Sequence, residues 1–117
     1  MSRRLERLNM LLRQQLSELI RRRIKDPRLA EFVSLTRVDV APDLETARVY
    51  VSIMGASQDK VSTMKALQSA SAYLRHELTG RLVIKRVPHL QFILDESIEE
   101  GAHLLDLINS VSSREQE

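Results

Sequence analysis

The chain has 117 residues, of which 43% are apolar and 29% charged; it has no cysteine and a formal net charge of +2. This length and composition are typical of one globular domain, and the lack of cysteine excludes disulfides and thiolate metal sites. No apolar run approaches the roughly 20 residues of a membrane-spanning helix. The basic N-terminus lacks the apolar core of a secretory signal, so we expect no membrane association.

The small net charge conceals a strong gradient along the chain. Residues 1–28 hold nine cations against three anions, a balance of +6, whereas residues 95–117 hold one cation against seven anions, a balance of −6. A dense basic segment is typical of proteins that bind a polyanion, and an acidic segment is repelled by that polyanion. We therefore expect a basic face for nucleic acid and an acidic end turned away from it.

Residues 3–25 have the pattern of a long amphipathic helix, because apolar residues recur at three- and four-residue steps along one side. Asp26-Pro27 predicts the end of this helix, since proline lacks the backbone N–H and disfavours the α conformation in the residue before it. The predicted apolar stripe consists of Leu5, Leu8, Leu12, Leu16, Leu19 and Ile20.

Two strands are predicted next, in "FVSLTRVDVA" (32–41) and "TARVYVSIM" (46–54), and the intervening "APDLE" has the composition of a turn. We expect an antiparallel hairpin. Val33 and Leu35 share one parity of the first strand, whereas Val38 and Val40 share the other. This change of phase predicts a β-bulge or a strand that is covered on both faces.

A second helix is predicted from Asp59 to residue 78, followed by a strand in "LVIKRVPHLQFIL" (82–94). Pro88 cannot donate to a ladder, so it marks a sheet edge or a bend. The last helix is predicted to begin at Ser97. Its apolar residues are expected to face the core: Ile98, Ala102, Leu105 and Ile108.

The predicted order is therefore α-β-β-α-β-α, which indicates an α+β fold. A hairpin followed by a right-handed helical crossover gives a small three-stranded mixed sheet with helices packed on one face. We expect one domain over residues 1–110 and a frayed tail over 111–117.

The sequence shows no catalytic or cofactor-binding motif. His76, His89 and His103 are too scattered for a local metal motif, and glycines occur only at 55, 80 and 101, which excludes a P-loop and a dinucleotide fingerprint. No serine lies in a nucleophile elbow. The carboxylates at 95–100 fit a solvated helix N-terminus better than a cation site. We expect no enzyme, no metal and no cofactor.

Two groups of cations are candidates for contacts with RNA. Cations at a helix C-terminus offset its partial negative charge by about 0.3–1 kcal/mol each, so a solvated helix end is one explanation. Crowded like charges repel one another, however, and this favours a polyanionic partner. The second group is either scattered surface charge or part of the same face. The candidates are Arg21, Arg22, Arg23, Lys25 and Arg28, with Arg75, Arg81, Lys85 and Arg86.

Only four residues are aromatic, two Phe and two Tyr, and Phe32 and Phe92 are expected to be buried. Proteins that bind single strands stack bases on exposed aromatic rings. So few rings indicate phosphate and 2′-hydroxyl contacts to structured RNA instead.

Three stretches resemble the bacterial ribosome-binding factor A family: "IKDPRLAEFVSLTRVDVAPDLETARVYVS", "ALQSASAYLRHEL" and "VPHLQFILDESIEEG". The resemblance covers residues 3–110. Its specific motifs are Asp26-Pro27-Arg28, the segment 43–52, Leu74-Arg75, Val87-Pro88, and Asp95 with Ser97 and Gly101.

This resemblance implies a type II KH-like domain with an added C-terminal helix. It also implies binding to the small (30S) ribosomal subunit and its 16S rRNA. The expected role is non-catalytic help in late maturation and 5′-end processing of the pre-rRNA, with a part in cold adaptation. We expect a cytoplasmic monomer with no small-molecule substrate.

The resemblance also implies a kink in the second helix. Ordinary KH domains hold nucleotides with a Gly-x-x-Gly loop, which is absent here, and the family instead has an Ala-x-Gly interruption. The matching residues are Ala70, Ser71 and Ala72. Alanine is the best helix former, so local propensity predicts an unbroken helix, but we follow the family and predict a kink at 70–72.

Two other functions remain open. A protein-interaction module would dock a partner through the first helix, the edge near Pro88 or the acidic last helix. A KH-like regulator of single-stranded RNA is disfavoured by the missing glycine loop and by the scarcity of aromatic residues.

Overall fold

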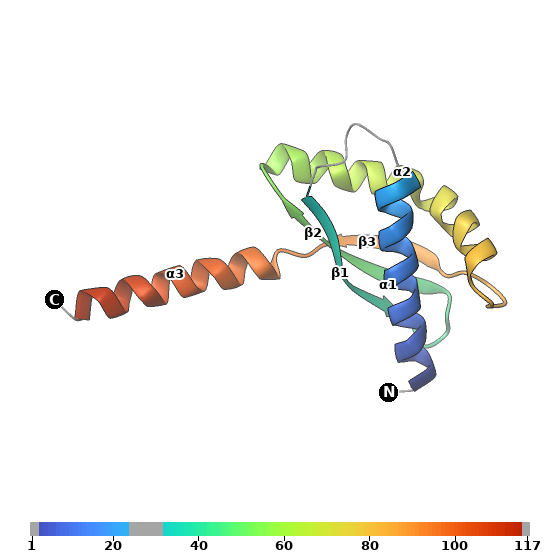
Figure 1. Ribbon diagram of the computed structural model, residues 1–117, viewed down its shortest axis with the longest axis horizontal. Helices are drawn as coiled ribbons and strands as arrows, with labels where there is room; N and C mark the ends of the chain where they lie inside the picture. The colour runs from blue at the N-terminus through green and yellow to red at the C-terminus, as the bar shows by residue number, and fades with distance from the viewer. Residues whose placement is uncertain (1–2, 24–31, 116–117) are drawn as a thin grey trace.

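The helices and strands of the computed structural model, which describes residues 3–23 and 32–115, follow the predicted order α-β-β-α-β-α (Figure 1). The predicted α+β class is confirmed. The elements are α1 (Arg3–Arg23), β1 (Phe32–Val40), β2 (Thr46–Met54), α2 (Ser57–Arg81), β3 (His89–Leu94) and α3 (Ser97–Glu115).

The three strands form one mixed sheet in the order β1-β2-β3. β1 and β2 make the predicted antiparallel hairpin, whereas β3 returns parallel to β2 after the α2 crossover. The register shifts between Leu35 and Arg37, so a β-bulge accounts for the change of phase in β1. Because of this bulge, Leu35 and Val38 are both buried. Pro88 directly precedes the edge strand β3, as its missing N–H requires.

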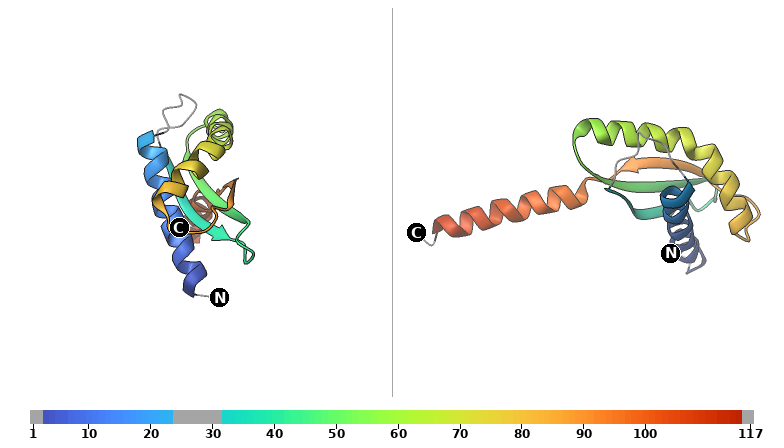
Figure 2. Two further views of the ribbon diagram at one scale, coloured as in Figure 1. Left: turned by 90° about the vertical axis from the view of Figure 1, so that its right-hand side faces the viewer. Right: turned by 45° about the horizontal axis from the view of Figure 1, so that its top comes forward.

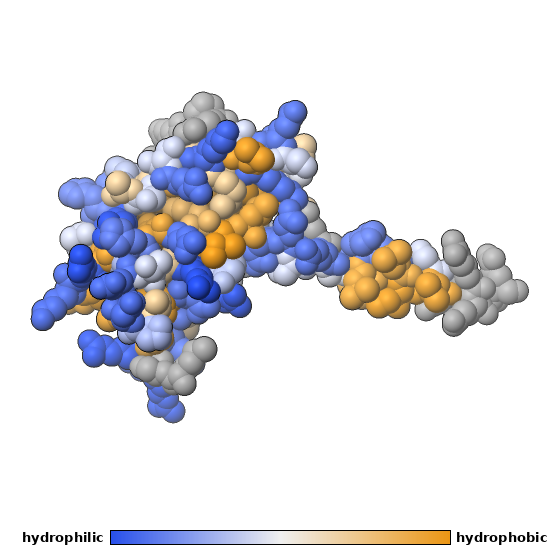
Figure 3. Space-filling view, turned by 180° about the vertical axis from the view of Figure 1, so that it is seen from behind, coloured by the Kyte–Doolittle hydropathy of each residue, from blue (hydrophilic) through white to orange (hydrophobic). Residues whose placement is uncertain are grey.

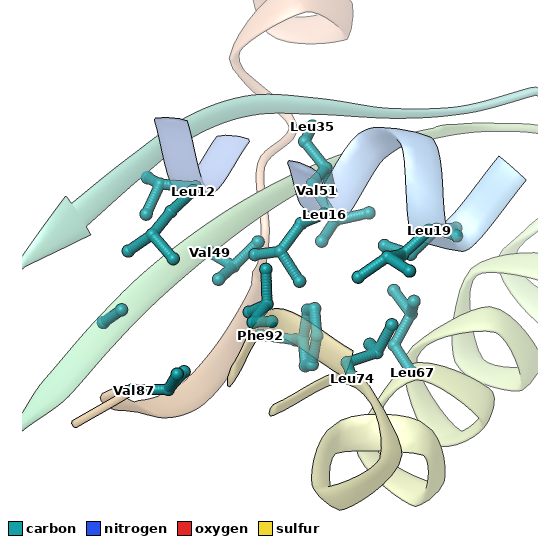
Figure 4. Close-up of a cluster of buried hydrophobic side chains, with 14 of the residues drawn as sticks. Leu12, Leu16, Leu19, Leu35, Val49, Val51, Leu67, Leu74, Val87 and Phe92 are labelled. Atoms are coloured by element: carbon teal, nitrogen blue, oxygen red, sulfur yellow. The ribbon is translucent and has the colours of Figure 1, made fainter. Parts of the chain in front are cut away.

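Helices α1 and α2 cover the same face of the sheet, as two views of the ribbon show (Figure 2). Leu12, Leu16 and Leu19 of α1 are fully buried and point toward Val49 and Phe92 of the sheet (Figure 4). Leucines from α2 close the same cluster. Burying a leucine stabilises the fold by about 1.5–3 kcal/mol, so this layer is the main source of stability.

Helix α2 is one continuous α-helix over Ser57–Arg81, and its ribbon changes direction along its length (Figure 1). It begins after Ala56, whose N–H donates to Oδ2 of Asp59 at 3.2 Å. The placement of the kink at Ala70, Ser71 and Ala72 stays a prediction.

Helix α3 does not join this layer and projects away from the sheet (Figures 1 and 2). The exposed side chains of Ala102, Leu105 and Ile108 correct the expectation that the last helix faces the core, and the side chain of Ile98 lies outside the described residues. The chain leaves the sheet at Asp95, whose N–H still donates to the Val51 carbonyl at 2.7 Å. The helix therefore starts at the sheet end and runs outward.

The projecting helix gives the molecule an elongated shape of 62 × 38 × 19 Å, with a radius of gyration of 17.3 Å. A compact chain of this length would have a radius of gyration of about 13 Å. Helix α3 continues through Glu115, past the expected boundary at residue 110, and the division of the chain there stays a prediction. In the described part of the chain, no helix combines the length and apolar content needed to cross a membrane.

Candidate nucleic-acid interface

Glu18 brings together cations that lie far apart in the sequence. Its Oε1 lies 3.4 Å from Nη1 of Arg22, one turn later in α1. Its Oε2 lies 3.7 Å from Nη1 of Arg81, at the end of α2. The same Arg81 nitrogen donates to Oε1 of Gln15 at 3.1 Å. One carboxylate thus stands between two guanidinium groups, which leaves a positive excess where α1 meets the end of α2.

Arg75 holds the chain segment that connects α2 to β3. Its Nε donates to the Pro88 carbonyl at 3.1 Å, and its Nη2 donates to the Val87 carbonyl at 3.0 Å. The side chain is partly buried. Arg75 therefore positions the loop 82–88, and a direct contact of Arg75 with RNA stays a prediction.

That loop carries the other two candidates of the second basic group. Lys85 and Arg86 are exposed and line an open depression of about 360 Å³ together with His76 and Thr79 of α2. A wide depression lined by cations and hydrogen-bond donors fits a phosphate group, since phosphate oxygens accept from both. The loop follows Arg81 directly in the chain, and Arg81 is the residue of α2 that contacts Glu18.

The first basic group is only partly visible. Arg21 and Arg22 are exposed on α1, and Arg22 keeps 74% of its side-chain exposure despite its contact with Glu18. Arg23 is the last residue of α1, and its side chain lies outside the described residues, as do Lys25 and Arg28 altogether. For these three cations the RNA contact stays a prediction.

Several further exposed cations were not among the candidates. Arg3 and Arg7 share the outer face of α1 with Arg21, as the helical period requires. They could have been found as the residues opposite the leucine stripe.

Another missed pair lies on the uncovered face of the sheet. The guanidinium carbon of Arg37 is 4.2 Å from the ring centre of Tyr50, within cation–π range. The pKa of Arg37 is raised above its ordinary value, first by its hydrogen bond with Tyr50. The alternation Arg48-Val49-Tyr50 signals this polar face, but nothing in β1 alone shows that Arg37 reaches Tyr50.

A possible metal site depends on how the histidine and carboxylate side chains of the described residues are arranged. In residues 3–23 and 32–115, no group of three or more histidine or carboxylate side chains is arranged to hold an ion. The three histidines lie on three different elements, α2, β3 and α3.

Comparisons with known proteins agree with one another. The sequence model of "Ribosome-binding factor A" matches residues 4–108. The ribosome-binding factor A of Acetivibrio thermocellus is 39% identical over 111 residues, which cover 95% of this chain and 90% of the relative.

Two structures of relatives share the fold. A putative ribosome-binding factor A of Thermotoga maritima, determined by NMR, superposes with a TM-score of 0.72 at 30% identity, covering 83% of this chain and 92% of its own. A homology model of the Thermus thermophilus ribosome-binding factor A, fitted into the cryo-EM map of a 30S complex, gives a TM-score of 0.62 at 26% identity, covering 75% of this chain and 91% of its own. From the family match and the identity to its relatives, this chain belongs to the ribosome-binding factor A family.

Proposed function

We propose that this protein is a non-catalytic assembly factor that binds the small ribosomal subunit through its 16S rRNA. The observation that carries the proposal is the junction at Glu18, where Arg22 of α1 and Arg81 of α2 meet beside the loop that holds Lys85 and Arg86. A relative from Thermus thermophilus has been fitted into a 30S complex, and this supports the small subunit as the partner.

The α-β-β-α-β-α order supports a KH-like mode of RNA binding without the glycine loop. Exposed cations without a platform of aromatic rings favour contacts to phosphates of folded RNA over stacking on single-stranded bases. The family resemblance extends the proposal to late maturation and 5′-end processing of 16S rRNA in the cytoplasm. A role in the cold follows physically, since misfolded RNA helices become longer-lived traps as the temperature falls.

Salt dependence tests the proposed contacts. Binding of the protein to small subunits and to protein-free 16S rRNA is measured at several salt concentrations. Each neutralised phosphate contributes about −0.7 to −0.9 to the slope of log K against log salt. The double variants R21A/R22A and K85A/R86A should each make this slope shallower by about 1.4–1.8 if both cations contact phosphates.

The matched control removes two exposed cations elsewhere. Arg13 is exposed on α1 about two turns before Arg21, and Arg48 is exposed on the uncovered face of the sheet. The variant R13A/R48A loses the same charge and should keep the slope of the parent. Binding that is indifferent to salt, or an equal change in the control, would contradict the proposed interface.

A further inference from the structure

The exposed side of α3 is an apolar surface without cover in the described structure. Leu104, Leu105, Leu107, Ile108 and Val111, here called the α3 apolar face, each keep between 51% and 61% exposure. At 100° per residue they share one side of the helix, and Asp106, Asn109 and Ser110 occupy the other. Figure 3 shows apolar side chains gathered on the projecting helix α3, here called the arm. They lie apart from the body, which is the sheet with α1 and α2. Contiguous exposed apolar patches of this kind mark interaction sites.

Polar contacts fix the base of α3 to the body. Oδ2 of Asp95 accepts from the hydroxyl of Thr36, the bulged residue of β1, at 2.7 Å. Oδ1 of Asp95 accepts from the N–H of Ser97 at 3.0 Å. Hydrogen bonds from the Ser97 side chain, from Thr36 and from the Ser97 N–H, in that order of size, lower the pKa of Asp95 to about 2. Glu96 adds a contact of 3.6 Å to Nζ of Lys60 on α2.

This anchoring keeps the α3 apolar face away from the body's own core. The two residues between β3 and α3 are both tied down by these contacts. A helix that starts from such a fixed point presents its face to an outside partner and does not fold back over the sheet.

The charge of the arm selects the chemistry of that partner. Helix α3 (Ser97–Glu115) holds four carboxylates, Glu99, Glu100, Asp106 and Glu115, against one cation, Arg114. RNA and anionic lipid are repelled by this charge. A second copy would bring two acidic helices together in either orientation. A protein segment rich in lysine or arginine, with apolar residues among them, matches both the charge and the apolar face.

We propose that the α3 apolar face docks a basic amphipathic segment of a protein on the small ribosomal subunit. That the partner lies on the small ribosomal subunit rests on the proposed function. That it is basic and amphipathic is inferred from the charge and the apolar face of α3. The body would hold RNA while the arm holds protein, so the two weak contacts reinforce each other through effective concentration. The factor would then bind best where that RNA and that protein already lie together.

Two double variants of equal charge test the contact. L104D/I108D places two carboxylates on the α3 apolar face, and N109D/S110D places two on the opposite side of the same helix. Added negative charge strengthens attraction to a basic partner, so a loss of binding reports lost apolar contact. All four residues are exposed, so both variants should keep the thermal unfolding midpoint of the parent.

The expected result is a loss of about ten-fold or more in affinity for intact small subunits with L104D/I108D, and none with N109D/S110D. Both variants should bind protein-free 16S rRNA as the parent does. Equal affinities of the two variants for intact subunits would overturn the proposal while leaving the RNA interface standing. Loss of all binding by the parent to subunits and to RNA would overturn both.

The position of the partner is read by photo-crosslinking. A benzoylphenylalanine in place of Leu105 should give an adduct with a ribosomal protein, at a segment that mixes cations with apolar residues. Adducts only with RNA, with a second copy of the chain or with its own body would overturn the proposal, as would the absence of any adduct. An adduct with protein, together with failed binding to free RNA, would keep this inference and refute the RNA interface.

Discussion

Helices α1 and α3 both carry leucine-rich stripes at three- and four-residue steps, but their surroundings differ. Leu12, Leu16 and Leu19 of α1 have no exposed surface, whereas Leu104 and Leu105 of α3 keep 57% and 61% exposure. Helix α1 lies across the sheet beside α2, and α3 begins where the sheet ends (Figure 1). The same amphipathic pattern therefore serves stability in one helix and leaves a surface for recognition in the other.

The polar contacts of the two helices also differ, because those of α1 are spread along the helix and those near α3 lie at its base. Helix α1 is tied along its length, since Oδ1 of Asn9 accepts from the Val40 N–H at 2.8 Å, and Gln15 and Glu18 meet Arg81 of α2. Near α3, long-range polar contacts of the described residues lie at the two residues before it, Asp95 and Glu96. A helix fixed along its length buries its stripe, and a helix fixed only at its base projects it.

Truncating one leucine in each apolar stripe should give the largest difference between the two helices, measured as the change in the free energy of unfolding. Leu16→Ala should lower the free energy of unfolding by about 2–5 kcal/mol, because it removes buried surface and leaves a cavity. Leu105→Ala, the matched change on α3, should alter it by less than about 0.5 kcal/mol. Urea denaturation measures both. A large cost for Leu105→Ala would mean that α3 packs against the body in solution and would remove the contrast between the helices.

The next test concerns the loop beside the basic junction. Arg75→Met keeps the aliphatic stem but loses the two bonds to the Val87 and Pro88 carbonyls. Hydrogen bonds from a charged donor contribute about 1.5–3 kcal/mol each, and less where water can replace them, so we expect a loss of about 1–3 kcal/mol. Hydrogen exchange should rise in residues 82–88.

Arg86→Met is the control for this change, because Arg86 is exposed on the same loop. It should leave both the stability and the exchange rates of the loop unchanged. If Arg75→Met behaves in the same way, Arg75 is a free surface cation and does not position the loop.

Local pattern was sufficient for most of the fold. The parity change at Leu35 and Val38 predicted a bulge or a strand covered on both faces, because side chains alternate strictly along a strand, and the register shows the bulge. Pro88 predicted a sheet edge or a bend through its missing N–H, and the edge strand β3 begins directly after it. Periodicity failed at α3, since it shows which side of a helix is apolar and not what covers that side. The cover depends on where the chain leaves the sheet, which Asp95 and Thr36 decide across a long sequence separation.

The candidate interface was predictable to a similar extent. The charge count identified Arg21, Arg22, Lys85 and Arg86, which the structure leaves exposed. It could not show that Arg75 is engaged with backbone carbonyls, because a guanidinium has the same charge whether it meets solvent, a carbonyl or a phosphate. Nor could it show that Glu18 joins the two basic groups.

The smallest effect is expected for mutations at the base of α3 that change the pKa of Asp95. These mutations test which contacts hold α3 in its direction. Thr36→Val removes the hydroxyl donor with little change of shape, so the pKa of Asp95 should rise from about 2 toward its ordinary 3.8. Ser97→Ala should raise this pKa further, because Ser97 is the larger cause of the shift. An NMR titration of the Asp95 carboxyl carbon measures both changes.

The sign of the pH dependence follows from the lowered pKa. An ionised Asp95 stabilises the folded state above about pH 3.8, and this contribution is lost as the pH falls toward 2. In Thr36→Val the folded-state pKa of Asp95 moves closer to its unfolded-state value. The stability of this variant should therefore fall less between pH 3.8 and pH 2 than that of the parent. Ser34→Ala, an exposed change on the same strand, should leave the titration as it is. An unchanged Asp95 pKa in Thr36→Val would show that the bulge does not hold the arm, and the fixed direction of α3 would lose its main physical cause.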